Sequence, residues 1–236
     1  MPYTLPARVK YKLAKERTVQ LHRFPAARPS RQALHMLRRL ARQWQGKSVG
    51  LYGGSFNPAH AGHLHVAEAA LRHCKLDAVW MLLSPGNPLK DGRAQTAFKT
   101  RFQHLEQLTE PFAHIYASDI EAQLGTRKSV DTVAALTKAM PNTDFVWLMG
   151  ADNLANFHLW HAYDAVARLL PIAVFDRPGY SMAGCNSKFS KRYAKYRVPA
   201  ERLTKHPCPA WAFVRIVRHR ASATQIRSDV QGPWIG

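Results

Sequence analysis

The sequence predicts an α/β fold in which a doubly wound, mostly parallel sheet carries helices on both faces. From Ser48 onward, short apolar runs alternate with segments of helical periodicity, which is typical of repeated βα units. The first apolar run, 49–52, passes through Gly53-Gly54 directly into a segment that should begin a helix. Glycine, proline and polar residues follow several of the later runs. Because ligands of such sheets bind at the carboxyl ends of the strands, these segments predict one composite site.

The expected elements can be placed in chain order. Ser30 can cap a helix over 31–44, which Gly46 ends. Strands are expected at 49–52, 78–83, 114–117, 145–149, 172–175 and 212–217. Helices are expected at 62–73, at 97–109, from a cap at Ser129 to Pro141 and from near Thr224, and a helical region is expected around 153–169. Loops are expected at 84–95, which is rich in proline and glycine, and at 178–209, which lacks periodicity.

The positive charge of the chain is concentrated at its two ends. The net charge is +19, of which residues 1–48 carry +11 and residues 177–236 carry +10, while 49–176 carry −2. A solvated basic surface explains this pattern, and a site for polyanionic ligands explains part of the excess at the C-terminal end. Dedicated nucleic-acid binding is disfavoured because the chain lacks zinc-finger spacing and aromatic residues interleaved with basic ones.

Two regions are expected, a basic N-terminal extension with one helix at 1–47 and a catalytic domain at 48–236. The extension resembles a mitochondrial presequence in being rich in arginine and poor in acids, and its helix either packs on the domain or binds a partner. We expect no membrane span because no apolar run approaches about 20 residues. Three scattered cysteines without metal-type spacing suit a reducing cytoplasm.

The turn after the first strand carries the strongest chemical signal. Gly53 and Gly54 allow a close approach of the backbone, and His60 and His63 lie three residues apart at a helix start, where both can face one ligand. Such a pair would meet phosphate oxygens and the charge that develops when pyrophosphate leaves. A metal site and plain surface or capping histidines are the alternatives. Walker and Gly-x-Gly-x-x-Gly motifs are absent, which disfavours P-loop and dinucleotide-binding proteins.

Two motifs together resemble the signatures of the nucleotidyltransferase superfamily. Residues 53–64, Gly-Gly-Ser-Phe-Asn-Pro-Ala-His-Ala-Gly-His-Leu, resemble the first signature, with Asn57 where many members have aspartate. Residues 222–227, Ser-Ala-Thr-Gln-Ile-Arg, resemble the second signature. In that motif Ser222 or Thr224 can cap a helix, and Arg227 offers a fork of donors for triphosphate oxygens. The resemblance implies a Rossmann-like fold and the transfer of a nucleotidyl group with release of pyrophosphate.

Further segments resemble bacterial nicotinate-nucleotide adenylyltransferases. They are the proline-rich loop 84–90, the segment 125–133, the Gly-x-Asp element that follows the strand at 145–149, the pair Trp160-His161 and the loop 175–180. The resemblance implies a catalytic set of His60, His63 and Arg227. It implies an ATP site formed by Gly53, Gly54, Ser55, Phe56, Gly150, Asp152, Ser222, Thr224 and Ile226. It implies a mononucleotide site formed by Asn57, Lys90, Thr132, Trp160, His161 and Arg177.

The resemblance therefore predicts an enzyme that makes nicotinate adenine dinucleotide from ATP and nicotinate mononucleotide in NAD biosynthesis. Mg²⁺ is expected to arrive with the triphosphate, and no metal site of the protein's own is expected. A homo-oligomer is compatible with the sequence. The alternatives are a transferase that uses nicotinamide mononucleotide or another phosphorylated acceptor, and a nucleic-acid-binding protein that uses its basic ends.

Overall fold

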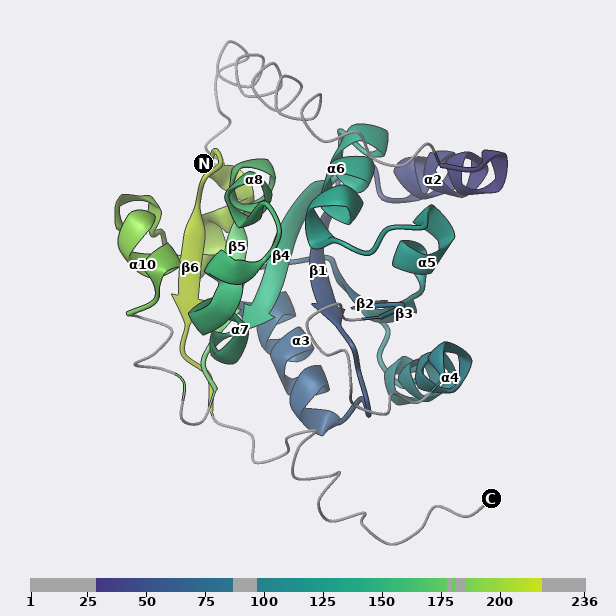
Figure 1. Ribbon diagram of the computed structural model, residues 1–236, viewed down its shortest axis with the longest axis horizontal. Helices are drawn as coiled ribbons and strands as arrows, with labels where there is room; N and C mark the ends of the chain where they lie inside the picture. Colours follow the sequence, from purple (N-terminus) through teal and green to yellow (C-terminus); the bar gives the residue numbers. More distant parts are fainter. Residues whose placement is uncertain (1–28, 87–96, 178–179, 181–185, 218–236) are drawn as a thin grey trace, which may run out of the picture.

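Six parallel strands form one sheet at the centre of the molecule (Figure 1). The computed structural model describes residues 29–86, 97–177, 180 and 186–217. The strands are β1 Ser48–Gly54, β2 Ala78–Leu83, β3 Ile115–Ser118, β4 Asp144–Gly150, β5 Ile172–Phe175 and β6 Trp211–Val214. Their order, β3-β2-β1-β4-β5-β6, is that of a Rossmann-like sheet, with the reversal between β1 and β4. The predicted fold class and all six predicted strands are confirmed.

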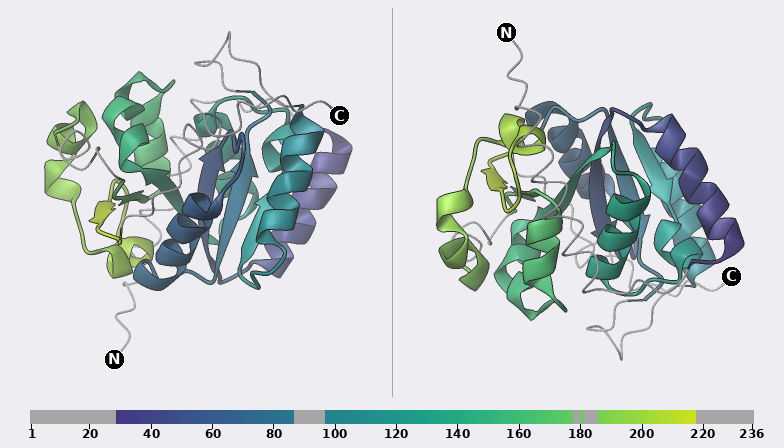
Figure 2. Two further views of the ribbon diagram at one scale, coloured as in Figure 1. Left: turned by 90° about the horizontal axis from the view of Figure 1, so that it is seen from below. Right: turned by 90° about the horizontal axis from the view of Figure 1, so that it is seen from above.

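Helices cover both faces of the sheet (Figure 2). The helices that pack into the core of one face are α2 Arg31–Gln43, α5 Ile120–Leu124, α6 Ser129–Ala139, α7 Ala151–Asn156, α8 Tyr163–Leu169 and α10 Lys188–Arg192. Those of the other face are α3 Ala61–His73, α4 Phe98–Thr109 and the 3-10 helix η4 Ala200–Lys205. Two short 3-10 segments, η2 Phe157–Leu159 and η3 Ala194–Tyr196, connect these elements.

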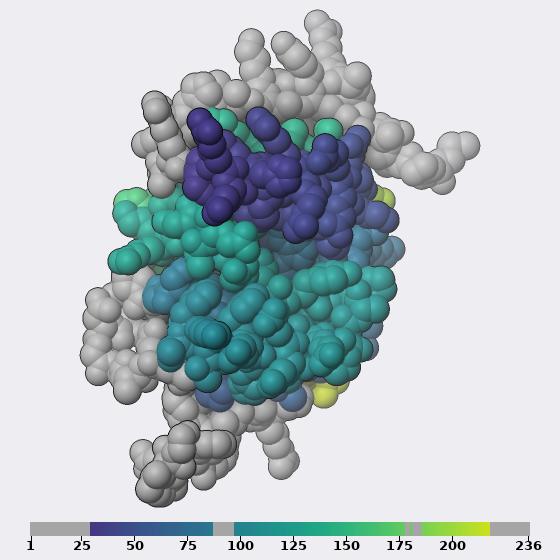
Figure 3. Space-filling view, turned by 90° about the vertical axis from the view of Figure 1, so that its right-hand side faces the viewer, coloured from purple at the N-terminus to yellow at the C-terminus, as the bar shows by residue number. Residues whose placement is uncertain are grey.

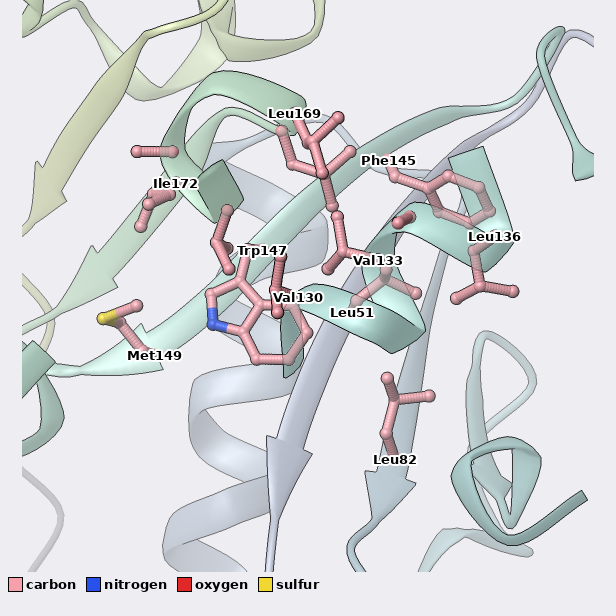
Figure 4. Packing of buried hydrophobic residues seen from close by; sticks show 14 of the residues in the cluster. Leu51, Leu82, Val130, Val133, Leu136, Phe145, Trp147, Met149, Leu169 and Ile172 are labelled. Carbon is pink, nitrogen blue, oxygen red and sulfur yellow. The ribbon is translucent and has the colours of Figure 1, made fainter. Parts of the chain in front are cut away.

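Alternation along β4 divides its side chains between the two cores. Phe145, Trp147 and Met149 enter the core beneath α6, whereas Val146 and Leu148 enter the core beneath α3. Figure 4 shows the Trp147 ring among aliphatic side chains of β1 and α6. The sheet is buried on both faces, and this explains why its strands appear in the sequence as continuous apolar runs.

The helix of the N-terminal extension packs on the domain. Ser30 caps α2 as predicted, since its Oγ accepts the Ala33 N–H at 3.1 Å. Leu37 is buried in the core, and α2 contacts α6. In Figure 3 α2 forms the purple band across one face of the molecule, directly against teal mid-chain residues. Trp44, which follows the helix, sets its ring at 5.4 Å and nearly perpendicular to that of Trp80.

The helical region predicted around 153–169 is confirmed, and it is divided into three elements. The chain forms α7, η2 and α8, and Ala162, which immediately precedes α8, has a left-handed φ of 50°. Phe157 is fully buried at the break, where its ring packs against those of Trp160 and Tyr163. Burying these rings favours the turn over a straight helix.

The segment 178–209, predicted as a loop, contains regular structure in its described part. Ser187 caps α10, and Phe189 and Tyr193 stack with ring centroids 4.8 Å apart. Phe189 also contacts the ring of Trp211 in β6 at 5.8 Å. The helix is held in place by these contacts of Phe189 with residues distant in the sequence.

Three smaller expectations are also corrected. Ser129 is the first residue of α6, and the residue at the cap position, Lys128, makes no side-chain cap. The short helix α5 was not predicted; it ends at Gly125, whose φ of 66° is left-handed. Strand β6 ends at Val214 rather than at 217. The helix predicted from near Thr224 lies outside the described residues.

Candidate active site

The glycine turn leaves β1 at the edge where the strands end, as the arrowheads of β1, β4 and β6 show in Figure 1. Its glycines make room for aromatic rings. A Cβ on Gly53 would come within 3.0 Å of the Trp147 ring, and one on Gly54 within 3.0 Å of the Phe56 ring. Phe56 itself is buried with a left-handed φ of 41°, while Ser55 and Asn57 are half-buried. Both glycines belong to β1, opposite Leu82 and Leu83 of β2, so the strand runs two residues further than predicted and the turn begins after Gly54. The two positions require glycine for packing, and close approach of a ligand there stays a prediction.

His60 and His63 together form a capping box at the N-terminal end of α3. The His60 Nδ1 accepts the Gly62 N–H at 3.1 Å, and the His63 Nδ1 accepts the His60 N–H at 3.2 Å. The ring centroids lie 3.8 Å apart. An Nδ1 that accepts a hydrogen bond requires the proton of a neutral ring to sit on Nε2. The structure therefore shows the predicted pair together, in the capping arrangement that the sequence left as an alternative.

The electrostatic surroundings keep His63 neutral. Burial, the neighbouring His60 and then the Arg177 guanidinium lower the pKa of His63 to about 2. The Phe56 ring meets the His63 ring edge to face at 5.0 Å. The free protein consequently presents an uncharged hydrogen-bond donor here across the physiological pH range, with the positive charge placed on Arg177.

Arg177 joins the ends of three neighbouring strands. Its Nη2 donates to the Tyr52 hydroxyl of β1 at 3.0 Å, and its Nε lies 3.7 Å from Asp152 Oδ1, just beyond β4. A Cβ on Gly150 would collide with Asp152 Oδ1 and would lie 2.9 Å from Arg177 Nε. The predicted residues Gly150, Asp152 and Arg177 are thus in contact. The glycine supplies the space in which the carboxylate and the guanidinium pair.

Thr132 lies in a buried polar cluster. Its side chain has no exposed surface, and its Oγ1 lies 2.7 Å from the Thr126 Oγ1 and donates to Glu121 Oε1 at 3.3 Å. Burial raises the pKa of Glu121 to about 7, and the hydrogen bond from Thr132 opposes that shift. The Thr132 hydroxyl thus contacts Thr126 and the Lys128 carbonyl, both in the segment 125–128. Its contact with a mononucleotide stays a prediction.

Glu121→Gln is expected to change how stability depends on pH. A pKa of about 7 in the folded chain, against an ordinary 4.5, corresponds to about 3 kcal/mol. This contribution is present below pH 4.5 and is lost as the pH rises through 7, because the buried carboxyl must then ionise. Between pH 4.5 and 8, the free energy of unfolding should therefore fall about 3 kcal/mol further in the unchanged protein than in the variant.

Urea denaturation at pH 4.5, 6 and 8 measures this difference. Glu110→Gln, at an exposed glutamate directly after α4, is the matched control and should follow the unchanged protein. Parallel curves for Glu121→Gln and the unchanged protein would show that Glu121 is already ionised in the folded chain.

The aromatic pair Trp160-His161 lies directly after η2. Trp160 is half-buried, with its ring edge to face against those of Phe157 at 5.3 Å and Trp147 at 6.3 Å, whereas His161 is exposed. Part of the Trp160 ring is thus supported by the core. Its stacking on a pyridine ring stays a prediction. Lys90, Ser222, Thr224, Ile226 and Arg227 lie outside the described residues.

The described ranges contain neither a metal-type cluster of side chains nor a membrane-spanning helix. Nowhere in them do three or more His, Cys, Asp or Glu side chains gather in a way that could hold a metal ion. Within these ranges, no helix is both long and apolar enough to cross a membrane.

Comparison of the sequence with known proteins identifies its family. A model of the cytidylyltransferase-like family matches residues 51–229, a span that includes both signature motifs. A probable nicotinate-nucleotide adenylyltransferase of Methylorubrum extorquens is 44% identical over 184 residues, which are 76% of this chain and 98% of that protein. One from Cereibacter sphaeroides is 43% identical over 186 residues, 79% of this chain and 98% of that protein. The chain belongs to the cytidylyltransferase-like family, among the nicotinate-nucleotide adenylyltransferases.

Solved structures agree on the fold of this nucleotidyltransferase. The Plasmodium falciparum nicotinic acid mononucleotide adenylyltransferase complexed with NaAD superposes with a TM-score of 0.59 at 16% identity, covering 77% of this chain and 83% of that one. The same enzyme complexed with APC gives a TM-score of 0.58 over the same shares. At this identity the likeness extends to the fold.

Sequence reasoning missed two side chains of this nucleotidyltransferase that contact predicted site residues or their loops. Tyr52 belongs to the apolar run that predicts the first strand, and its hydroxyl also accepts a hydrogen bond from Arg177 Nη2. Arg101, in the expected helix 97–109, reaches the carbonyl of Ser55. A tyrosine hydroxyl inside an apolar strand requires a partner, and that requirement was the available signal. For Arg101, the sequence holds no comparable signal.

Proposed function

We propose that this chain transfers the adenylyl group of ATP to nicotinate mononucleotide, forming nicotinate adenine dinucleotide and pyrophosphate. The relatives above support the reaction, and one structural observation supports the site. At the carboxyl edge of the sheet, the His60 and His63 rings lie together at the start of α3, and His63, whose pKa is lowered to about 2, interacts electrostatically with Arg177. A phosphate ester bound there would meet uncharged donors and one fixed cation together.

In the proposed reaction, an oxygen of the mononucleotide phosphate attacks the α-phosphorus of ATP in line. A new phosphorus–oxygen bond forms, and the bond between the α-phosphorus and the bridging oxygen breaks as pyrophosphate leaves. The attacking oxygen is already ionised, so no general base and no covalent intermediate are needed. Catalysis then consists of positioning and charge stabilisation. MgATP is the substrate form, with Mg²⁺ bound by the phosphates and water.

The two histidines would act as phosphate donors through their side chains. The amides of His60, Gly62 and His63 all donate within the turn itself, to His63 Nδ1, His60 Nδ1 and the His60 carbonyl. We assign the Nε2–H groups of the two rings to the reacting phosphates. Asp152 is assigned to the adenosine ribose, where a carboxylate can accept from hydroxyl groups.

Purified protein tests the proposal directly. With MgATP and nicotinate mononucleotide it should release pyrophosphate and form a product with the mass of nicotinate adenine dinucleotide. Nicotinamide mononucleotide in a parallel reaction measures acid-against-amide selectivity. If folded protein releases no pyrophosphate with the acid, the assignment is rejected, and turnover of the amide instead would favour the alternative acceptor.

A further inference from the structure

Arg101 connects two loops that leave the sheet at the site edge. It belongs to the first turn of α4, and the residue is only 4% exposed. Its Nη1 donates to the Ser55 carbonyl at 2.6 Å and to the Ser84 carbonyl at 3.1 Å, and its Nη2 donates to the Pro85 carbonyl at 3.4 Å. One guanidinium therefore bonds to main-chain oxygens of both loops.

The two loops begin side by side and carry different parts of the proposed site. Strands β1 and β2 are neighbours, with Gly54 opposite Leu83, and the Ser84 N–H donates to the Gly54 carbonyl at 2.9 Å. The loop with Ser55 continues to the histidines assigned to the reacting phosphates. The loop that begins at Ser84 is the one that the sequence resemblance assigns to the mononucleotide. Beyond the Ser84–Gly54 bond, Arg101 supplies the side-chain connection between them.

The chemistry of the contact favours arginine specifically. A buried charge is tolerated when hydrogen bonds compensate for its lost hydration, and burial lowers the pKa of Arg101 from its ordinary value without removing the charge. The Nη1 atom bonds to both loops, and the Nη2 atom of the same planar fork adds the Pro85 carbonyl, whereas a lysine offers one nitrogen on a shorter, flexible stem. The Phe98 ring, 5.7 Å from the guanidinium carbon, adds a further contact.

We propose that Arg101 is a positioning residue that fixes the spacing of the phosphate loop and the mononucleotide loop, and through it the approach of one substrate to the other. This inference rests on the proposed function. A displacement of about 1 Å at a reacting centre can reduce the rate by about 10²-fold. Loss of Arg101 should therefore reduce kcat more than it raises the KM of either substrate, because each loop still binds its own ligand.

Three variants test the proposal. Arg101→Met removes the charge and the donors. Arg101→Lys keeps the charge, but its side chain is shorter and lacks the second nitrogen that reaches the Pro85 carbonyl, so it should hold the two loops less well. Thr109→Ala is the matched control, since Thr109 is equally buried on the same helix but bonds within it, to the Leu105 and Glu106 carbonyls. The measurements are kcat and both KM values at 25 °C, the melting temperature, and hydrogen–deuterium exchange of residues 53–60 and 83–86.

Arg101→Met should lower kcat by about 10–10²-fold and Arg101→Lys by about 10-fold, with exchange faster in both loops. Thr109→Ala should lower the melting temperature and leave kcat and loop exchange unchanged. If Arg101→Met does not fold, Arg101→Lys decides the matter. A folded Arg101→Lys variant with unchanged kcat and unchanged loop exchange overturns the proposal. If the unchanged protein shows no turnover, the proposed function fails, and the exchange measurement still decides whether Arg101 couples the loops.

Discussion

Replacing His63 with alanine is expected to lower kcat by about 10²–10³-fold, with a smaller effect on the KM values. The physical reason is that its Nε2–H is assigned to charge that develops on the phosphates in the transition state, and one such donor in a water-poor site contributes on that scale. Because the pKa of His63 is about 2 in the free protein, this residue should add no limb to the pH profile of kcat/KM between pH 5 and 9. Steady-state kinetics with MgATP and nicotinate mononucleotide measure both quantities.

The His63 experiment needs a variant that separates catalysis from capping, since His63 Nδ1 also accepts the His60 N–H. His63→Asn retains an acceptor for that amide but lacks the ring Nε2–H, so it should approach alanine in kcat while recovering part of the melting temperature. His73→Ala, at an exposed histidine in the last turn of the same helix, should change neither. A His63→Asn variant with nearly normal kcat would remove His63 from the chemistry.

Asp152→Asn is expected to raise the KM for ATP by about 10–10²-fold. Hydrogen bonds to a charged group contribute about 1.5–3 kcal/mol, and a tenfold change in affinity corresponds to about 1.4 kcal/mol. The substitution preserves shape, so Gly150 still accommodates the side chain, while Arg177 loses the carboxylate 3.7 Å from its Nε. The KM for ATP, measured at saturating mononucleotide, is the readout.

Deoxy analogues of ATP identify the contact that Asp152 makes. The unchanged protein should discriminate against the analogue that lacks the bonded ribose hydroxyl, and Asp152→Asn should lose that discrimination. Asp164→Asn is the control, because Asp164 also pairs with an arginine, Arg192 at 2.9 Å, but does so between α8 and α10. Equal discrimination by the unchanged protein and Asp152→Asn would place the carboxylate away from the ribose.

The parts of the fold that sequence could predict are those with strong local signals. The continuous apolar runs identified all six strands, and Ser30 identified the start of α2. The break at Ala162 and the helix α10 could not be predicted in the same way, because both depend on where Phe157 and Phe189 pack in three dimensions. Such burial is decided by residues distant in the sequence, and local pattern does not contain it.

The candidate site shows the same division. The motif around the glycine turn predicted that His60 and His63 lie together, and topology predicted that Asp152 lies at the same edge as that turn. Arg177 was assigned to the site by the family resemblance alone, and the structure pairs it with Asp152. The tautomers of the histidines could not be predicted, because they follow from which backbone N–H each Nδ1 accepts. The bridge made by Arg101 depends on the relative placement of two loops and a helix, which no spacing in the sequence encodes.

The helix α2 has a consequence for any shortened version of this protein. The family match begins at residue 51, so a fragment that starts there would look complete by comparison with relatives. Yet Leu37 fills part of the core, and Trp44 stands edge-on against both Trp80 and Tyr116. A chain that begins at residue 48 would lack this helix and would expose apolar and aromatic side chains beside the edge strand β3. Such a surface is expected to cause aggregation during expression.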